Sequence, residues 1–175
     1  MSLPEDIGEA LSFMPLTQHW VPLLWPLIEG HIEEIPRSWP TTHDELEKWA
    51  LGTRKQQTIA DRSVILMQSD EGREHLPVGL ITGDLVRGAN STNFPGAEFG
   101  DVNIAYMVFS LYRGQGIASR ALNQVRQAWI EDSKSPVLRI DIGNKASQSV
   151  AEKAGFVYME TVEVNGRKLQ LFRSI

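Results

Sequence analysis

Residues 106–122 read YMVFSLYRGQGIASRAL and place two glycines, Gly114 and Gly116, between an apolar run and a helical pattern. The apolar residues of that pattern recur at helical spacing: Ile117, Ala121, Leu122, Val125, Ala128 and Trp129. The segment therefore predicts a strand, a tight turn and an amphipathic helix. Glycines let a backbone approach a ligand, and a helix N-terminus offers free N–H groups, so the turn is a candidate anion site. An ordinary strand-to-helix turn would show the same pattern.

The other strand signals favour a mixed sheet. Residues 137–142 follow the helix as a β-branched run, and a strand–helix–strand unit is best closed by parallel pairing. Residues 63–68 and 78–86 form two apolar runs around a turn at 70–72. Residues 156–164 and 168–172 flank Asn165-Gly166, a strong hairpin signal. We expect an α/β (α+β) fold whose sheet has about seven strands and is mostly antiparallel.

The N-terminal third is expected to be helical and irregular. Residues 10–16 predict a first strand, and Pro22 and Pro26 interrupt the helical stretch that follows it. Thr42 and Asp44 offer N-caps to a polar helix that ends near residue 55. Residues 87–100 have a loop composition, and residues 149–154 predict a short helix. We expect one domain over residues 1–175, with a helical region at about 17–58 and a core at about 61–175.

Composition excludes several kinds of chemistry. The chain has 175 residues, of which 42% are hydrophobic, 22% are charged and none is cysteine. It therefore has no thiol nucleophile and no Cys-ligated metal, and its four histidines show no metal-binding spacing, so no metal is expected. A net charge of −5 argues against nucleic-acid binding. Without an apolar run of membrane-spanning or signal-peptide length, we expect a cytoplasmic protein that binds no membrane.

Three phosphate-binding loops compete for the glycine turn. A Walker A loop requires Gly-Lys-Ser/Thr, whereas this turn continues Gly-Ile-Ala. A dinucleotide fingerprint requires a third small residue where Ser119 stands, and Asp141 could supply its acid. That hypothesis, a nucleotide-dependent oxidoreductase, needs a doubly wound sheet, for which too few strand–helix–strand units exist.

The third loop carries a family resemblance. Residues 113–118 resemble the acyl-CoA loop of the GNAT family of N-acetyltransferases. Residues 144–156 (NKASQSVAEKAGF) are similar to the signature of its RimJ/RimL branch, which acetylates protein N-termini. Residues 103–117 also align with that branch, and Trp39-Pro40 is a weaker match. The resemblance implies a sheet that splays between its fourth and fifth strands to admit acetyl-CoA.

The implied reaction is direct acetyl transfer to a primary amine, without an acyl-enzyme. A peptide or protein N-terminal α-amine is the first choice of acceptor. A small amine, such as a polyamine or an aminoglycoside, is the alternative. The resemblance assigns cofactor binding to Met107, Val108, Phe109, Arg113, Gly114, Gln115, Gly116, Ile117, Ala118, Asn144 and Ser147. Asn144 would also serve as a plain turn or helix cap.

Proton transfer is the least constrained part of the prediction. The resemblance makes Ser147 the acid for the leaving thiolate, although Ser149 and Glu152 have capping-box spacing that would give Ser147 a structural role. Ala151 stands where many family members have a tyrosine acid, and Asn103 stands where many have a glutamate base. Asp101 and Glu163 are the candidate bases, and Trp39 and Asn103 the candidate acceptor contacts. An inactive CoA-binding domain is the alternative to an enzyme. The sequence is compatible with a monomer and with a homodimer.

Overall fold

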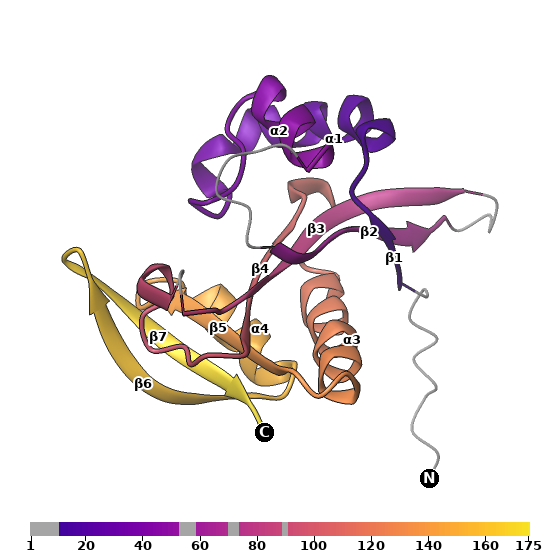
Figure 1. Ribbon diagram of the computed structural model, residues 1–175. Helices are drawn as coiled ribbons and strands as arrows, with labels where there is room; N and C mark the ends of the chain where they lie inside the picture. The colour runs from indigo at the N-terminus through magenta and orange to yellow at the C-terminus, as the bar shows by residue number, and fades with distance from the viewer. Residues whose placement is uncertain (1–10, 53–58, 70–73, 89–90) are drawn as a thin grey trace, which may run out of the picture.

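The computed structural model describes residues 11–52, 59–69, 74–88 and 91–175, and within them seven strands form one sheet (Figure 1). The strands are β1 Leu11–Pro15, β2 Ile59–Gln68, β3 His75–Leu85, β4 Asp101–Val108, β5 Ser135–Asp141, β6 Phe156–Val164 and β7 Arg167–Ser174. Their order in the sheet is β1-β2-β3-β4-β5-β7-β6. Only β4 and β5 pair in parallel. The predicted mixed, mostly antiparallel sheet is confirmed, and the doubly wound alternative is wrong.

Helices cover both faces of the sheet. Helices α3 (Ile117–Glu131) and α4 (Lys145–Lys153) lie on one face, while α1 (Val21–Ile28) and α2 (His43–Ala50) lie on the other (Figure 1). Each face has its own apolar core, and alternate residues of β4 contribute to each. Val102 and Ile104 belong to the core beneath α3, whereas Met107 belongs to the core beneath α1 and α2. Neighbouring odd-numbered positions of β4, including Asn103, consequently face the N-terminal helices.

The irregular N-terminal third follows from its prolines. Pro22 sits in the first turn of α1, where its missing N–H costs nothing, and Pro26 lies inside this eight-residue helix. Short 3₁₀ turns, Gln18–Trp20 and Glu29–Glu34, flank α1. Thr42 caps α2 as predicted by accepting a hydrogen bond from the Glu45 N–H. The helix ends at Ala50, and the predicted continuation to residue 55, like the turn at 70–72, lies outside the described residues.

Helix α4 begins earlier than the sequence indicated. Asn144 is its N-cap, and the Asn144 Oδ1 accepts a hydrogen bond from the Ser147 N–H at 3.1 Å. Ser149 and Glu152 therefore lie within the helix, so the expected capping box there is wrong. The predicted hairpin at Asn165-Gly166 is confirmed, because both residues have the positive φ, 49° and 76°, that such a two-residue turn requires.

Candidate active site

The sheet opens where β4 and β5 part. The two strands pair only from Asp101 to Ile104 and from Ser135 to Leu138. Beyond that point the rest of β4 pairs with β3, and the rest of β5 pairs with β7. No strand fills the gap between them within the described residues, which confirms the expected splay.

Two adjoining clefts occupy this opening. The first, of about 690 Å³, we call the turn cleft, and its lining includes Met107, Val108, Arg113, Gly114, Gly116, Ile117, Ala118 and Ser119. The second, of about 720 Å³, we call the arginine cleft, and its lining includes Arg37, Ser38, Asn103, Arg139, Asp141 and Arg167. Glu33, Glu34, Tyr106, Asn144 and Ser147 line both. The opening therefore connects the glycine turn with the face below the N-terminal helices.

The glycine turn has a left-handed backbone. Gly114 has φ +78° and Gly116 has φ +71°, and a Cβ on either would meet no atom within 4 Å. Backbone conformation, rather than crowding, therefore requires glycine at both positions. Gly116 is the N-cap of α3 and makes no side-chain cap bond, so the first N–H groups of this 15-residue helix face the turn cleft. These groups and the helix dipole favour an anion there.

Arg113 links the turn to the N-terminal region. Its Nε donates to the Val108 carbonyl at 3.0 Å, and its Nη2 lies 2.6 Å from Glu34 Oε2. His31 Nδ1 is 3.3 Å from Glu34 Oε1, and His31 Nε2 is 3.0 Å from Ser110 Oγ. The hydrogen bond from Arg113, followed by that from His31, lowers the pKa of Glu34. A chain of polar contacts thus connects the turn Glu29–Glu34 to the residues just after β4.

The backbone of β4 has free groups on its β5 side. The Phe109 N–H donates to the Val78 carbonyl of β3 at 2.9 Å, whereas the Val108 carbonyl accepts from Arg113. Backbone groups of successive residues in a strand point to opposite sides, so those of Tyr106 and Val108 face the gap. Of the three strand residues predicted to bind the cofactor, Met107 and Val108 line the turn cleft, whereas Phe109 is buried in the N-terminal core and lines neither cleft.

Three polar residues meet at the junction of the clefts. Asn144 caps α4, its amide oxygen already engaged by the Ser147 N–H. The Tyr106 hydroxyl is enclosed and has no hydrogen-bond partner of standard geometry among the described residues. Burial raises the pKa of Tyr106, and the neighbouring Ser147 hydroxyl opposes this shift. The motif pointed to Ser147, but nothing in the sequence indicated that Tyr106 would lie next to it.

A charged row crosses the sheet beside the arginine cleft. Asp84 on β3 lies directly opposite Asn103 on β4, so both side chains are on the same face. Arg139 on β5 donates from its Nε to Asn103 Oδ1 at 3.0 Å. Burial raises the pKa of Asp84 to about 6 despite the opposing charges of Arg139 and Arg62, and burial lowers the pKa of Arg139 to about 10. Asp84 is not among the site residues that the sequence predicts, and its one signal there is a carboxylate within an apolar strand.

The predicted bases lie elsewhere. Asp101 shares the face of Asn103, but it is buried, accepts from Arg173 Nη1 at 2.8 Å and from the Glu98 N–H, and lines neither cleft. Glu163 is exposed on β6, opposite Lys168 and away from both clefts.

Trp39, a predicted acceptor contact, and Asp141, the acid of the dinucleotide hypothesis, both make contacts that stabilise the fold. Trp39 is buried, with its ring centroid 5.5 Å from that of Trp49, and lines neither cleft, whereas its neighbours Arg37 and Ser38 line the arginine cleft. Asp141 accepts from the Gly143 N–H at 3.0 Å and pairs with Arg167 at 2.8 Å, and these bonds lower its pKa. The carboxylate of Asp141 therefore binds the turn after β5 and the start of β7.

Comparison with known proteins identifies the fold. A family model described as an acetyltransferase (GNAT) domain matches residues 17–157. The chain belongs to the GNAT acetyltransferase family. Its members transfer acetyl groups, so the chain is an enzyme of that kind, as expected. No curated protein sequence matches it.

Solved structures of this family share the fold at low identity. The aminoglycoside acetyltransferase AAC(6')-Ib with ribostamycin and coenzyme A superposes with a TM-score of 0.77 at 14% identity, covering 95% of this chain and 93% of the other. RimL, a ribosomal L7/L12 α-N-protein acetyltransferase, has a TM-score of 0.69 at 18% identity, covering 94% and 90%. A chimera of spermidine N-acetyltransferase SpeG from Vibrio cholerae has a TM-score of 0.66 at 14% identity, covering 94% and 95%.

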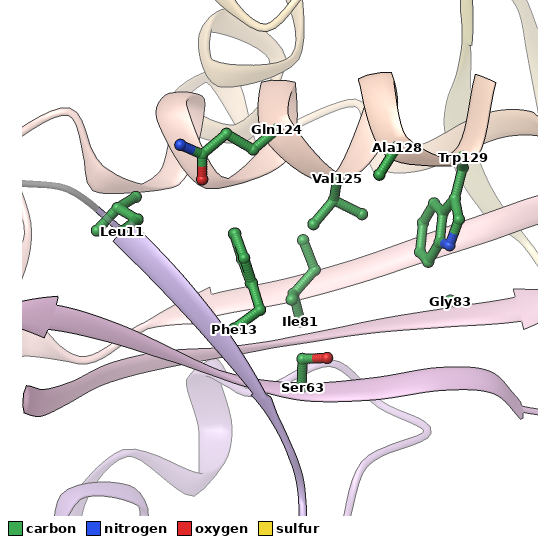
Figure 2. Close-up of a pocket in the computed structure, with 9 residues that line it drawn as sticks. All are labelled: Leu11, Phe13, Ser63, Ile81, Gly83, Gln124, Val125, Ala128 and Trp129. Carbon is green, nitrogen blue, oxygen red and sulfur yellow. The ribbon is translucent and has the colours of Figure 1, made fainter. Parts of the chain in front are cut away.

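A separate cavity of about 350 Å³ lies between α3 and the strands β1 to β3 (Figure 2). Its lining is Leu11, Phe13, Ser63, Ile81, Gly83, Gln124, Val125, Ala128 and Trp129, none of which is titratable. It therefore offers no acid–base chemistry. Among the described residues there is also no group of three potential metal ligands, and no helix is long and apolar enough to cross a membrane.

Proposed function

We propose that this protein transfers the acetyl group of acetyl-CoA to a primary amine, with a peptide N-terminal α-amine as the first choice of acceptor. The observation that carries the proposal is the continuous opening between β4 and β5, which joins the turn cleft to the arginine cleft. A donor and an acceptor entering from opposite sides of the sheet would meet there. We place this activity in the cytoplasm, in a monomer or a homodimer of single-domain chains.

The turn cleft fits coenzyme A as a co-substrate. Its pyrophosphate would take the N–H groups at the start of α3, together with Arg113. The pantetheine arm would pair, as a strand does, with the backbone groups of Tyr106 and with the Val108 N–H, since the Val108 carbonyl already accepts from Arg113. An N–H there would stabilise the oxyanion that forms on the thioester carbonyl. Gln115 lies between the two glycines, and Asn144 is left to hold the arm with its amide nitrogen.

Asp84 is our candidate for the general base. In the reaction the amine nitrogen bonds to the thioester carbon, the carbon–sulfur bond breaks, and one amine proton must leave. Asp84 lies beside Asn103 and has a pKa of about 6, so it is ionised at neutral pH yet more basic than an exposed aspartate. Asp84 itself lines neither cleft, so it would take the proton through a water beside Asn103, which lines the arginine cleft. Asp101 and Glu163 are weaker candidates, because the first is held by Arg173 and the second faces away from the clefts.

Ser147 and Tyr106 are our candidates for protonating the thiolate. Both line both clefts, and their hydroxyl groups are neighbours. With its raised pKa, Tyr106 keeps its proton at neutral pH. Its hydroxyl can therefore donate a hydrogen bond to the Ser147 oxygen while Ser147 gives its proton to sulfur, and Ser147 regains a proton from solvent after CoA leaves.

A small amine is the second candidate acceptor. It is favoured by the overlap with an aminoglycoside enzyme at a TM-score of 0.77, above the 0.69 for RimL. The peptide acceptor is supported by the motif at residues 144–156 and by the volume of the arginine cleft, about 720 Å³.

The test combines cofactor binding with turnover. Thermal unfolding is followed with excess acetyl-CoA, CoA and NADP, and CoA release is followed with peptide and polyamine acceptors. At 100 times Kd, a ligand adds about 2.7 kcal/mol to native stability. For a chain of this size the midpoint would rise by roughly 5–10 °C. CoA binding without CoA release from any amine would indicate an inactive CoA-binding domain, and no CoA effect would refute the proposal.

A matched pair of glycine variants locates the cofactor site. Gly116 and Gly166 have similar positive φ values, 71° and 76°, and an added Cβ meets nothing at either position. Gly116→Ala and Gly166→Ala thus impose similar backbone strain. We expect Gly116→Ala to weaken CoA binding at least tenfold, whereas Gly166→Ala, in the hairpin turn, keeps the wild-type affinity.

A further inference from the structure

Two guanidinium groups of the arginine cleft take part in none of its ion pairs among the described residues. Glu34 is engaged by Arg113 at 2.6 Å, and Asp141 is engaged by Arg167 at 2.8 Å. After these two pairs, the charged residues that line this cleft are Glu33, Arg37 and Arg139. In a chain with a net charge of −5, two guanidinium groups outside these pairs therefore lie at the cleft where the acceptor would bind.

Arg37 and Arg139 are available to a ligand in different ways. Arg37 is exposed and has no hydrogen bond or ion pair within the described residues. Arg139 is largely buried, its Nε donates to Asn103, and its guanidinium lies 5.0 Å from the ring centroid of Phe94, while its two terminal nitrogens have no hydrogen-bond partner in that same part of the chain. Asp84 offsets part of the charge on Arg139, and Arg37 interacts electrostatically with Asp141, without a hydrogen bond or ion pair between them among the described residues. Two guanidinium groups, from the segment before α2 and from β5, thus border one cleft.

We infer that the acceptor of this enzyme carries a carboxylate close to its reactive amine, and that Arg37 and Arg139 bind this carboxylate. The inference rests on the proposed function and names its substrate class. The planar donors of arginine match a carboxylate, and a partly buried cleft strengthens the pairing. The occupant is a peptide with acidic residues directly after its N-terminus. The same charges repel polyamines and aminoglycosides, which carry several positive charges.

The test compares peptides that differ only in charge. CoA release from acetyl-CoA is measured with Ser-Asp-Asp-Tyr-amide, with the near-isosteric neutral Ser-Asn-Asn-Tyr-amide, and with Ser-Lys-Lys-Tyr-amide. A fourth peptide, Ser-Asn-Asn-Tyr with a free C-terminus, separates a terminal carboxylate from side-chain carboxylates. For the wild type we expect kcat/KM to be about tenfold higher with the acidic peptide than with the neutral one, mainly through KM, and this preference to shrink with added salt.

The variants are Arg37→Gln and Arg37→Glu, with Lys134→Gln as the control. Lys134 pairs with Asp132 after the end of α3 and lines neither cleft, so the control removes a positive charge remote from the site. Arg37→Gln should reduce the acidic preference to about threefold or less, and Arg37→Glu should reverse it in favour of the lysine peptide. Lys134→Gln should keep it. Because Arg37 is exposed and unpaired, its variants should fold, and Arg139→Lys gives a second, more conservative test at the buried position.

Each outcome decides something. Equal turnover of the three peptide amides, or a preference for the lysine peptide by the wild type, overturns the inference and leaves the proposed function standing. An acidic preference that survives in Arg37→Gln, Arg37→Glu and Arg139→Lys also overturns it. No CoA release from any peptide or polyamine, in protein that CoA still stabilises, rejects the proposed function and the inference with it.

Discussion

Two aspartates on neighbouring strands show how surroundings separate structural from chemical carboxylates. Asp101 has both oxygens engaged, by Arg173 and by the Glu98 N–H, and its side chain is almost fully buried. Asp84 accepts no such bond within the described part of the chain, and burial raises its pKa to about 6. The carboxylate of Asp101 is therefore held by two donors, whereas burial makes the ionisation of Asp84 costly. A carboxylate kept at such a cost is a candidate for proton transfer.

The first prediction concerns the pH dependence of catalysis. If Asp84 accepts the amine proton, it must be ionised, so kcat/KM should fall as the pH falls through about 6. Asp84→Asn should lower kcat/KM by about 10²-fold or more and remove that acidic limb. The measurement is a profile of CoA release from pH 5 to 9 on both proteins, with Asp132→Asn as an exposed control. An acidic limb that persists unchanged in Asp84→Asn would assign the base elsewhere.

The second prediction concerns stability. The folded-state pKa of Asp84 is raised from 3.8 to about 6, so the folded protein binds more protons than the unfolded chain between these values. The free energy of unfolding therefore decreases from about pH 4 to pH 6 and stays lower above that. Asp84→Asn has no group to ionise, and its unfolding midpoint should exceed that of the wild type by about 5 °C at pH 8 and by little at pH 4. An equal gain at both pH values would contradict the shifted pKa.

The third prediction is that Asp101→Asn lowers the stability of the protein, whereas Asp84→Asn raises it. Removing this charge leaves Arg173 without its closest ionic partner in a partly buried site. Breaking such a pair costs about 3 kcal/mol, so the variant should unfold at a clearly lower urea concentration. If CoA release per folded molecule survives, Asp101 is structural, whereas loss of turnover with unchanged stability would restore it as the base.

At the scale of elements, the sequence predicted what local patterns encode. The strands, the glycine turn and the final hairpin follow from alternation, from apolar spacing and from Asn165-Gly166, which act over a few residues. The start of α4 was misplaced because two capping arrangements fit the sequence. The helix uses Asn144, and Ala151 is fully buried along it. Which residues meet across strands, such as Asp84 and Asn103, depends on register, and register is not a local property.

The fourth prediction belongs to the pairing of β3 with β4. A Cβ on Gly79 would overlap the carbonyl oxygen of Met107 and lie 3.2 Å from the Cα of Val108. Backbone atoms cannot move aside as side chains do, so Gly79→Ala should push β4 away from β3 and cost about 1–3 kcal/mol. It should also weaken CoA binding, since Met107 and Val108 line the turn cleft. Gly30→Ala, where a Cβ meets nothing, is the control for urea unfolding and CoA titration.

At the scale of the whole molecule, a chain of polar contacts links the N-terminal region to the glycine turn. Glu34 contacts both Arg113 and His31, and His31 contacts Ser110. Composition could not reveal this link, because its members are nearly 80 residues apart in the sequence. Through this link the Glu34 carboxylate binds Arg113, the arginine that would hold the pyrophosphate of CoA in the proposed function. Cofactor binding and the position of the N-terminal region should therefore be coupled.

The last prediction tests that coupling. Arg113 is anchored through its Nε to the Val108 carbonyl, so it stays in place without Glu34, and its Nη2 becomes free for a phosphate oxygen. Glu34→Gln should therefore tighten CoA binding by about threefold to fivefold at low salt, with a smaller gain at high salt. Glu33→Gln is the matched control, because Glu33 lines the same clefts but has no ion pair with Arg113. Equal gains in both variants, by calorimetric titration, would reduce the effect to general charge repulsion. Weaker binding in Glu34→Gln would mean that Glu34 positions Arg113 for the cofactor rather than competing for it.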